Sequence, residues 1–312
     1  MRYIFSQTNV TKFKWQLEVA ITNLTSLGVS PKDIFIILLD VPDGDPTTKP
    51  TLEKYGVNVY QYPQNAVLFY KYWYIPYVKP YGLYLFFNEH PEAIPYTYMY
   101  QDSDVIYREL VDESKLNVDA THWTGSETGS YTGLAYIESK GDSLVKLMAD
   151  KVGVTEDVIR GLGEHVPGAQ VVFNSPNPDW FKASAELCGE LYSYLGSIEP
   201  EFKKMYAEQG HPDTYPIQRW TAQMWTDIWI PANAGIHMST SPELDFCFAT
   251  DTMETMNKRK IYHDAGVSAD DKDMFFKGKY DHGLEPFGQD FSYVNKNKAS
   301  YLYVQAIEKV HK

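Results

Sequence analysis

The residues with the clearest chemical potential are two aspartates that follow an apolar run. Tyr98-Met99-Tyr100 is apolar and strand-forming, and Asp102 and Asp104 come directly after it, one residue apart. Two carboxylates at this spacing can face one divalent cation, because Mg²⁺ and Mn²⁺ prefer oxygen ligands and are commonly shared with substrate phosphates. The pattern therefore indicates a cation site that would neutralise a departing diphosphate. The alternative is a solvated acidic turn, since Asp-x-Asp also occurs by chance in chains of this size.

Alternating strand and helix patterns surround this pair in the first third of the chain. Short apolar runs predict strands at 3–5, 34–39, 57–60 and 97–100, and the spacing of apolar residues predicts a helix over 11–27. Residues 6–9 are polar and are expected to form the loop after the first strand, while 69–87 form an aromatic helical stretch. This order is typical of a Rossmann-like mixed α/β sheet flanked by helices. Ligands of such sheets bind at the carboxyl ends of the strands, where Asp102 and Asp104 fall.

The second half of the chain is less regular. Helices are expected near 142–151, 182–195, 217–230 and 298–311, and a strand at 171–173. No internal repeat and no low-complexity linker interrupts the chain. We therefore expect one domain with a C-terminal elaboration.

Composition excludes several classes of protein. The formal net charge of −13 opposes a protein that coats nucleic acid, although it leaves room for a local basic groove. Cys188 and Cys247 lack the spacing of a metal site and are too few for a disulfide framework, as in a cytosolic protein. The N-terminal run lacks the apolar core of a signal peptide, and no window has the length and apolarity of a membrane span. We expect a cytoplasmic protein with no membrane segment.

Aromatic residues are unusually frequent, with 25 Tyr, 15 Phe and 7 Trp. Most of them must belong to the core, but those near 70–77 come too densely for all to be buried. Aromatic rings stack on sugars and on bases. Some of the following residues are therefore expected to form a binding wall: Tyr70, Tyr72, Trp73, Tyr74 and Tyr77.

Together these features resemble the nucleotide-sugar glycosyltransferases of the GT-A type. Those enzymes have a Rossmann-like N-terminal half, an Asp-x-Asp metal motif about a third of the way along, and a late His. More narrowly, the chain resembles the hydroxyproline O-arabinosyltransferase and peptidyl-serine galactosyltransferase group. Three stretches carry this narrower resemblance: 78–82 leading into 94–107, Trp220 to Trp225, and Ile261 to Gly266. One position departs, because Gln223 stands where the group has Glu.

The resemblance implies a divalent cation, Mn²⁺ or Mg²⁺, and a UDP-sugar as donor. Asp104 would ligate the cation, Asp102 would contact the cation, its water shell or the ribose, and His263 would be the third ligand. Residues 1–110 would form the nucleotide-sugar-binding half, and 111–312 the half that binds the acceptor and completes the metal site. The alternative for His263 is a purely structural role.

Further donor contacts follow from the same resemblance. The loop after the first strand would hold the nucleoside, and a late loop with two lysines would close over the diphosphate, the lysines acting as point charges on its oxygens. An ordinary polar loop and an exposed turn are the alternatives. The proposed nucleotide contacts are Gln7, Thr8, Lys79, Gly266, Lys277 and Lys279.

Two further segments are expected to line the donor sugar. Residues 123–126, with Trp123 and Gly125, contain small side chains that let the backbone approach a sugar. Residues 168–170 resemble a short Gly-Ala-Gln-like motif of related enzymes, and Gln170 offers both a donor and an acceptor. An ordinary turn before a strand is the alternative for 168–170.

Gln223 and Asp227 lie one turn apart on one helix face. An inverting transferase needs a general base beside the acceptor hydroxyl, and Asp227 could serve, or it could be a surface acid. The enzymes that the chain resembles retain the anomeric configuration, and in such a mechanism the leaving diphosphate can take the acceptor proton. Retention is therefore the preferred prediction.

The sequence thus predicts a metal-dependent glycosyltransferase that moves a hexosyl or pentosyl group from a UDP-sugar to a hydroxyl. The acceptor stays open between a hydroxylated peptide, a glycan and a hydroxymethylated pyrimidine in DNA, the last as in virus-encoded enzymes of the host cytoplasm. The missing signal peptide argues against a secretory peptide modifier, and the charge of −13 argues against DNA. The alternative function is a non-catalytic nucleotide- or sugar-binding protein on the same fold.

Overall fold

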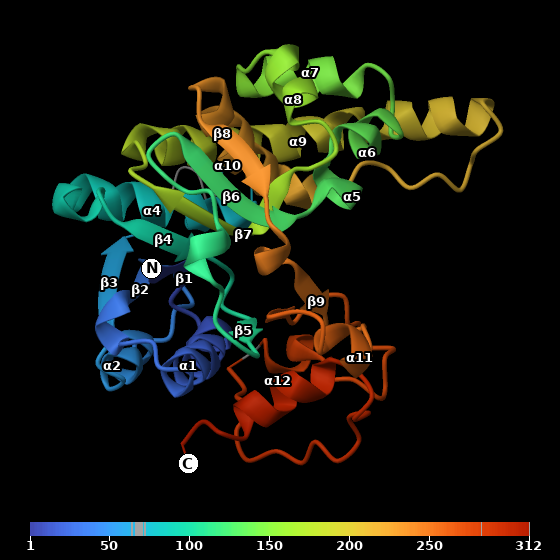
Figure 1. The fold of residues 1–312 in the computed structure, drawn as a ribbon. Coiled ribbons are helices and arrows are strands. Elements are labelled where there is room, and N and C mark those ends of the chain that lie inside the picture. The colour runs from blue at the N-terminus through green and yellow to red at the C-terminus, as the bar shows by residue number, and fades with distance from the viewer. Residues whose placement is uncertain (64, 66–70, 72, 282, 312) are drawn as a thin grey trace. The chain divides into compact units, whose positions relative to one another are not determined.

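The computed structural model describes residues 1–312 except 64, 66–70, 72, 282 and 312. The chain folds into two compact units, each built from segments that are far apart in the sequence (Figure 1). The first unit comprises Met1–Pro63, Tyr98–Leu116 and Ser241–Lys312, and the second comprises Gln64–Thr97 and Asn117–Thr240. The predicted boundary at residue 110 falls inside a segment of the first unit.

The first unit is built on parallel strands. In spatial order they are β3 (Asn58–Pro63), β2 (Ile34–Asp40), β1 (Arg2–Thr8) and β4 (Thr97–Tyr100). The helices of this part are α1 (Thr11–Ser26) and α2 (Thr48–Glu53), with a 3₁₀ turn at Pro31–Asp33. The apolar side chains of β1 and β2 are buried, as expected for inner strands of a parallel sheet.

The predicted loop at residues 6–9 is wrong in its first three positions. Ser6, Gln7 and Thr8 belong to β1 and are buried, because β1 pairs with β2 as far as Thr8 opposite Leu39. Backbone pairing with a neighbouring strand outweighs the turn preference of polar side chains here.

A small second sheet follows in the same unit. Its order is β5 (Val105–Tyr107), β10 (Ile261–His263) and β9 (Phe246–Phe248), with β10 antiparallel to β5 and parallel to β9. The remaining elements of the unit are α11 (Met253–Met256), α12 (Ser300–Ile307) and 3₁₀ turns at Glu113–Lys115, Pro242–Leu244 and Lys277–Tyr280 (η7). The closing helix is shorter than the predicted 298–311. α1 and α12 pack together through Trp15 and Tyr303, whose ring centroids are 6.4 Å apart.

The second unit has its own strands and most of the helices. β6 (His122–Glu127) lies between β7 (Pro167–Asn174), to which it is antiparallel, and β8 (His237–Thr240), to which it is parallel. Residues 123–126 therefore lie in β6 and residues 168–170 in β7, so the alternative of a turn at 168–170 is wrong. The short helices are α5 (Gly129–Thr132), α6 (Leu134–Glu138), α7 (Leu144–Val152) and α8 (Glu156–Leu162), with 3₁₀ turns at Ile75–Tyr77, Pro91–Ala93 and Arg219–Thr221.

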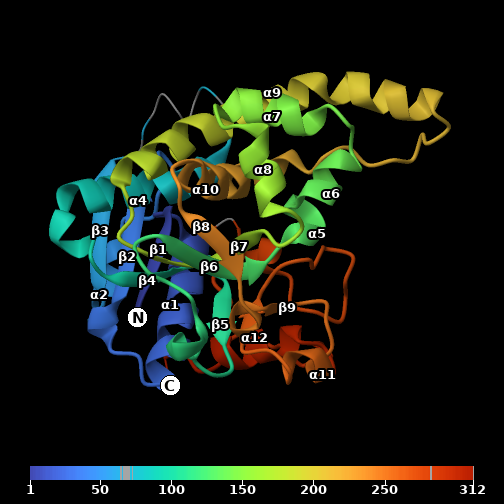
Figure 2. The same cartoon turned by 45° about the horizontal axis from the view of Figure 1, so that its top comes forward.

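Three longer helices complete this unit. α9 (Pro178–Glu208) packs against α4 (Val78–Glu89) and α10 (Ala222–Asn233) (Figure 2). Asn177 caps α9 by accepting a hydrogen bond from the backbone N–H of Asp179 at 3.0 Å, and Pro178 occupies the first position. The helix is longer than the predicted 182–195. Within the aromatic stretch 69–87, Ile75–Tyr77 is a 3₁₀ turn and α4 begins at Val78, and part of the stretch lies outside the described residues.

None of the helices in the described part of the chain offers the long apolar stretch that a membrane crossing needs.

Candidate functional site

The acidic pair lies in the turn that joins β4 to β5, and this turn is fixed from two sides. Ser103 is buried and its hydroxyl donates to Oε1 of Gln16 in α1 at 2.7 Å. The backbone N–H of Asp264, just after β10, donates to the carbonyl oxygen of Asp104 at 3.0 Å. The side chain of Asp104 is 8% exposed and that of Asp102 is 24% exposed. The turn therefore presents one buried and one accessible carboxylate.

β10 brings His263 to this turn from 159 positions further along the chain. Antiparallel pairing sets His263 opposite Val105, next to Asp104 in sequence. The Nε2 atom of His263 lies 3.4 Å from Oδ1 of Asp104 and 3.7 Å from Oδ2 of Asp102. One ligand atom from each of these three residues lies within 4.8 Å of the others. The structure thus brings together all three residues that the sequence singled out as metal ligands.

The donor set has the chemistry of a divalent cation site. Two carboxylates and an imidazole nitrogen converge, as they do around Mn²⁺ and related ions. The other ring nitrogen of His263, Nδ1, is buried and has no hydrogen-bond partner among the described residues. The residues present therefore fit a cation.

Lys277 reaches the same turn from η7. Its Nζ donates to Oδ2 of Asp104 and to the carbonyl oxygen of Asp264. Burial alone would raise the pKa of Asp104, but the charges of Lys277 and His263 outweigh it and hold that pKa well below its usual range. Burial alone would lower the pKa of Lys277, but Asp104 and Asp264 outweigh it and raise that pKa. Both groups are therefore charged near neutral pH.

Asp264 is a member of this site that the sequence reasoning missed. Its side chain is buried and accepts a hydrogen bond from the hydroxyl of Tyr262 at 2.7 Å. Burial raises the pKa of Asp264 to about 6, against the opposing charge of Lys277. The sequence signal for Asp264 was its place directly after His263, because a single acid lacks the pairing that singled out Asp102 and Asp104.

The other two residues expected in the late loop lie apart from these contacts. Lys279 is exposed, and its ammonium lies 5.7 Å from the centre of the Tyr280 ring. Gly266 is exposed three positions after His263.

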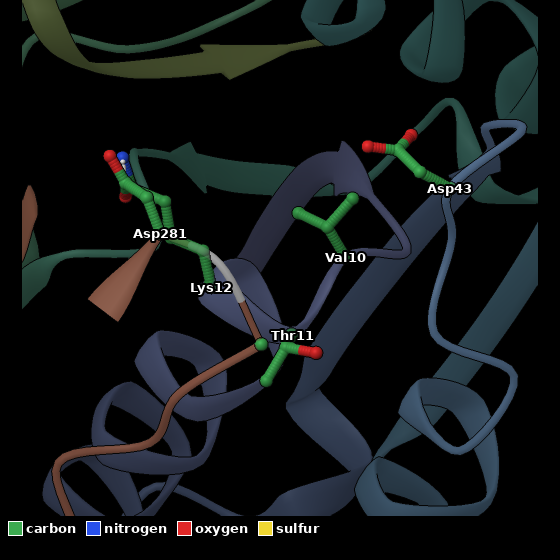
Figure 3. Close-up of a pocket in the computed structure, with 6 residues that line it drawn as sticks. Val10, Thr11, Lys12, Asp43 and Asp281 are labelled. Carbon is green, nitrogen blue, oxygen red and sulfur yellow. Dashed lines mark ion pairs between the residues drawn. The ribbon is translucent and has the colours of Figure 1, made fainter. Parts of the chain in front are cut away.

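A cavity of about 390 Å³ opens near the carboxyl ends of β1 and β2 (Figure 3). Its lining comes from the start of α1, the loop after β2 and the segment after η7: Val10, Thr11, Lys12, Asp43, Asp281 and Gly283. Lys12 and Asp281 form an ion pair at 2.7 Å. Gln7 and Thr8, each 3% exposed inside β1, are not among these lining residues.

In the second unit, β6 and β7 hold the residues expected to line a donor sugar. Trp123 is buried and donates through Nε1 to the carbonyl of Asn174 at 3.2 Å. Gln170 is buried; its Oε1 accepts from the hydroxyl of Ser126 at 2.9 Å, and its Nε2 has no partner in the described part of the chain. A Cβ at Gly125 would lie 2.9 Å from the backbone oxygen of Gln170, so only glycine fits there.

The proposed catalytic pair on α10 is tied into a hydrogen-bonded network. Nε2 of Gln223 donates to Oδ2 of Asp227, and the hydroxyl of Ser184 on α9 donates to Oδ1. Ser184 and Thr226 also share a hydrogen bond at 2.7 Å. Both carboxylate oxygens of Asp227 are therefore engaged, and they link α9 to α10.

The remaining predicted residues of the second unit have varied surroundings. Lys79 is half-buried in the first turn of α4. Of the aromatic group near 70–77, Trp73 is 67% exposed, whereas Tyr74 and Tyr77 are buried. The other two members, at positions 70 and 72, lie outside the described residues.

No protein-family model matches the chain, and no curated protein sequence matches it. Among solved structures, the whole chain is similar to half of the bifunctional glycosyltransferase WbbM in its apo form, at 9% identity and a TM-score of 0.50. It is also similar to galactosyltransferase LgtC bound to donor and acceptor sugar analogs (12% identity, TM-score 0.49), over all of this chain and 97% of that one. Mouse xyloside xylosyltransferase 1 is matched over 84% of this chain and 96% of that one (14% identity, TM-score 0.38).

These comparisons concern the fold. The chain spans half the length of the WbbM chain, and at 9% identity that likeness shows a shared fold and no more. The fold class predicted from the sequence, a Rossmann-like α/β fold of the GT-A glycosyltransferase type, is thereby confirmed.

Proposed function

We propose that the protein is a metal-dependent glycosyltransferase that moves a hexosyl or pentosyl group from a UDP-sugar to a hydroxyl acceptor. The observation that carries this proposal is the convergence of Asp102, Asp104 and His263, with Lys277 beside them, within a fold shared with a glycosyltransferase. Structures of this fold host several functions, so the site, and not the fold, supports the chemistry.

In this proposal Asp104 and His263 hold a divalent cation and Asp102 completes the set. The imidazole ligand favours Mn²⁺ over Mg²⁺, which takes oxygen ligands almost exclusively. The cation supplies Lewis-acid neutralisation of the diphosphate leaving group. Asp102, the more exposed carboxylate, is placed to contact the ribose or the water shell as well. The positive charge of Lys277 would lie beside the oxygens of the diphosphate.

The cavity at the carboxyl ends of β1 and β2 is the proposed place of the nucleoside. Its volume of about 390 Å³ is in the range of small-molecule pockets. Ligands of parallel α/β sheets bind at this edge. The backbone at Val10 and Thr11 and the side chain of Asp43 would offer the polar contacts, in place of the buried Gln7 and Thr8.

The residues predicted to contact the donor sugar and the acceptor belong to the second unit. Gln170 stays the predicted contact to a sugar hydroxyl, although its side chain is buried in β7 and its Nε2 has no partner among the described residues. Because Gln223 and Ser184 occupy both oxygens of Asp227, this carboxylate is a poor general base. That supports retention of configuration, in which the leaving diphosphate takes the acceptor proton. The cytoplasmic location stays a prediction.

The decisive experiment is transfer or hydrolysis of a panel of UDP-sugars with Mn²⁺, comparing the wild type with Asp104→Asn. We expect the variant to lose about 10²-fold or more in turnover, because the metal's charge stabilisation is worth several kcal/mol. Asp270→Asn removes an exposed carboxylate of the same unit and should leave turnover unchanged. Full activity of Asp104→Asn, or turnover after removal of metal with EDTA, would contradict the proposal.

The same panel of UDP-sugars also tests which acceptor is used and whether the protein is catalytic at all. Peptide, glycan and modified-DNA acceptors can be scored together by mass spectrometry of the products. Binding of UDP without turnover on any donor would identify the alternative, a non-catalytic nucleotide- or sugar-binding protein.

A further inference from the structure

The two carboxylate oxygens of Asp104 face two different side chains. Oδ1 lies 3.4 Å from Nε2 of His263, on the side shared with Asp102. Oδ2 instead accepts a hydrogen bond from the ammonium of Lys277. The carboxylate proposed to anchor the cation therefore already has a counter-ion.

The ammonium is held in this position by more than one contact. Besides Asp104, it donates to the carbonyl oxygen of Asp264. The backbone N–H of Asp264 in turn donates to the carbonyl of Asp104 at 3.0 Å. The end of β10, the turn between β4 and β5, and η7 thus form one hydrogen-bonded cluster, in which the side chain of Lys277 is 28% exposed.

A divalent cation at Oδ1 would lie close to this ammonium. Like charges at such a separation repel strongly when they are partly shielded from water. The repulsion is relieved if Lys277 moves to another anion, and the exposed 28% of its side chain gives the ammonium access to one from the solvent side. A diphosphate bound at the cation would offer such an anion.

We propose that Lys277 is the internal counter-ion of the cation site and makes cation and diphosphate bind cooperatively. The cation shares Asp104 with the ammonium and binds weakly alone. It binds more tightly once a diphosphate gives Lys277 a second partner. This inference rests on the proposed function, since it assumes the cation site formed by Asp102, Asp104 and His263.

The test measures Mn²⁺ binding directly, from the free-Mn²⁺ electron paramagnetic resonance signal, with and without UDP. In Lys277→Met we expect Mn²⁺ alone to bind about tenfold tighter than in the wild type, because the repulsion is gone. The factor by which UDP tightens Mn²⁺ binding should shrink, and by linkage the factor by which Mn²⁺ tightens UDP binding shrinks equally.

Two further variants serve as controls, and a third is a substitute for Lys277→Met. Lys277→Arg keeps the charge and should bind Mn²⁺ alone as weakly as the wild type. Lys272→Met removes an exposed lysine of the same unit and should change neither quantity. Lys277→Gln replaces the Met variant if that one does not fold, with the same expectation.

The outcomes separate the two proposals. If the wild type binds Mn²⁺ and Lys277→Met or Lys277→Gln binds it with equal or lower affinity, the counter-ion role is overturned and the cation site stands. If neither the wild type nor any Lys277 variant binds Mn²⁺, the proposed cation site and this inference are both wrong. The same holds if Asp104→Ala binds Mn²⁺ as well as the wild type does.

Discussion

Glu243 is a single residue whose charge holds together separate segments of the first unit. Its Oε2 lies 2.6 Å from Nζ of Lys260 and accepts from the backbone N–H of Asp112 at 3.1 Å. Its Oε1 lies 3.0 Å from Nζ of Lys115. The hydrogen bond from Lys260 is the largest cause that lowers the pKa of Glu243, from 4.5 to about 2. Ionised Glu243 therefore stabilises the folded state.

We expect Glu243→Gln to lower the free energy of unfolding at pH 7 by about 1.5–3 kcal/mol, the usual range for hydrogen bonds to a charged group. Because the folded pKa lies below the unfolded one, this stabilisation is complete above about pH 4.5. It is lost as the pH falls toward 2. Urea unfolding at several pH values between 7 and 3 measures the difference.

Glu254→Gln is the matched control for this prediction. Glu254 pairs with Lys258 at the surface, where both side chains are more than two-thirds exposed. Such pairs contribute little to stability. A difference between Glu243→Gln and the wild type that stays constant down to pH 3 would refute the role of the charge.

At the scale of elements, two exposed glycines of the second unit differ in where they lie: one follows the end of its helix and the other lies inside its helix. Gly153 ends α7 with a φ of +76°, whereas Gly161 lies inside α8. Neither position has any atom that would obstruct a Cβ. The backbone conformation alone therefore decides the effect of adding a methyl group.

We expect the same substitution to have opposite signs at these two positions. Gly153→Ala should cost about 1–2 kcal/mol, because an L residue is strained in the left-handed region. Gly161→Ala should stabilise by about 0.5–1 kcal/mol, because alanine favours the helix. Thermal and urea unfolding of both variants measure this. A change of the same sign in both variants would contradict the prediction.

The elements show where sequence patterns succeed and where they fail. α1, β2 and β4 were predicted to within one or two residues, because apolar periodicity reports directly which face is buried. The ends of β1 and β7 were not, since Gln7 and Gln170 are polar and buried. Pairing with neighbouring strands keeps these residues extended, and a single-sequence pattern carries no record of pairing. α9 continues past Pro200, which would ordinarily end a helix.

The candidate site, too, could be predicted only where it depends on residues that are neighbours in the sequence. Asp102 and Asp104 could be singled out because they are adjacent and follow a strand. The contact between Lys277 and Asp104 spans 173 positions and depends on the pairing of β5 with β10. A local sequence pattern does not reveal which strands pair. His263 and Lys277 were therefore predicted from the resemblance to a family alone.

At the scale of the whole molecule, the 41 acidic side chains outnumber the 28 basic ones, so a basic residue readily finds a carboxylate partner. Each of the six basic residues that could have formed a nucleic-acid groove lies within 4 Å of a carboxylate. They are Lys12, Lys14, Arg219, Lys258, Arg259 and Lys260. A phosphate backbone would have to displace these partners, and that disfavours DNA as the acceptor. Peptide or glycan acceptors are therefore the better choice for a first screen.

The two thiols of the chain are divided between the two units. Cys188 belongs to α9 of the second unit and Cys247 to β9 of the first, and both are fully buried. Burial raises the pKa of Cys247 to about 12 and that of Cys188 well above its usual range, so neither is a thiolate at neutral pH. Each unit thus contains one buried, unreactive cysteine thiol.

This placement provides a built-in reporter of how the chain unfolds. We expect iodoacetamide at pH 8 to modify neither cysteine in the native protein, as peptide mass spectrometry would show; rapid modification of either would contradict its burial. As urea is increased, the two peptides will gain the label at one concentration if the units unfold as one cooperative system, and at two if they unfold separately. The wild-type chain, without any engineered probe, can therefore reveal whether the two units are stable independently of each other.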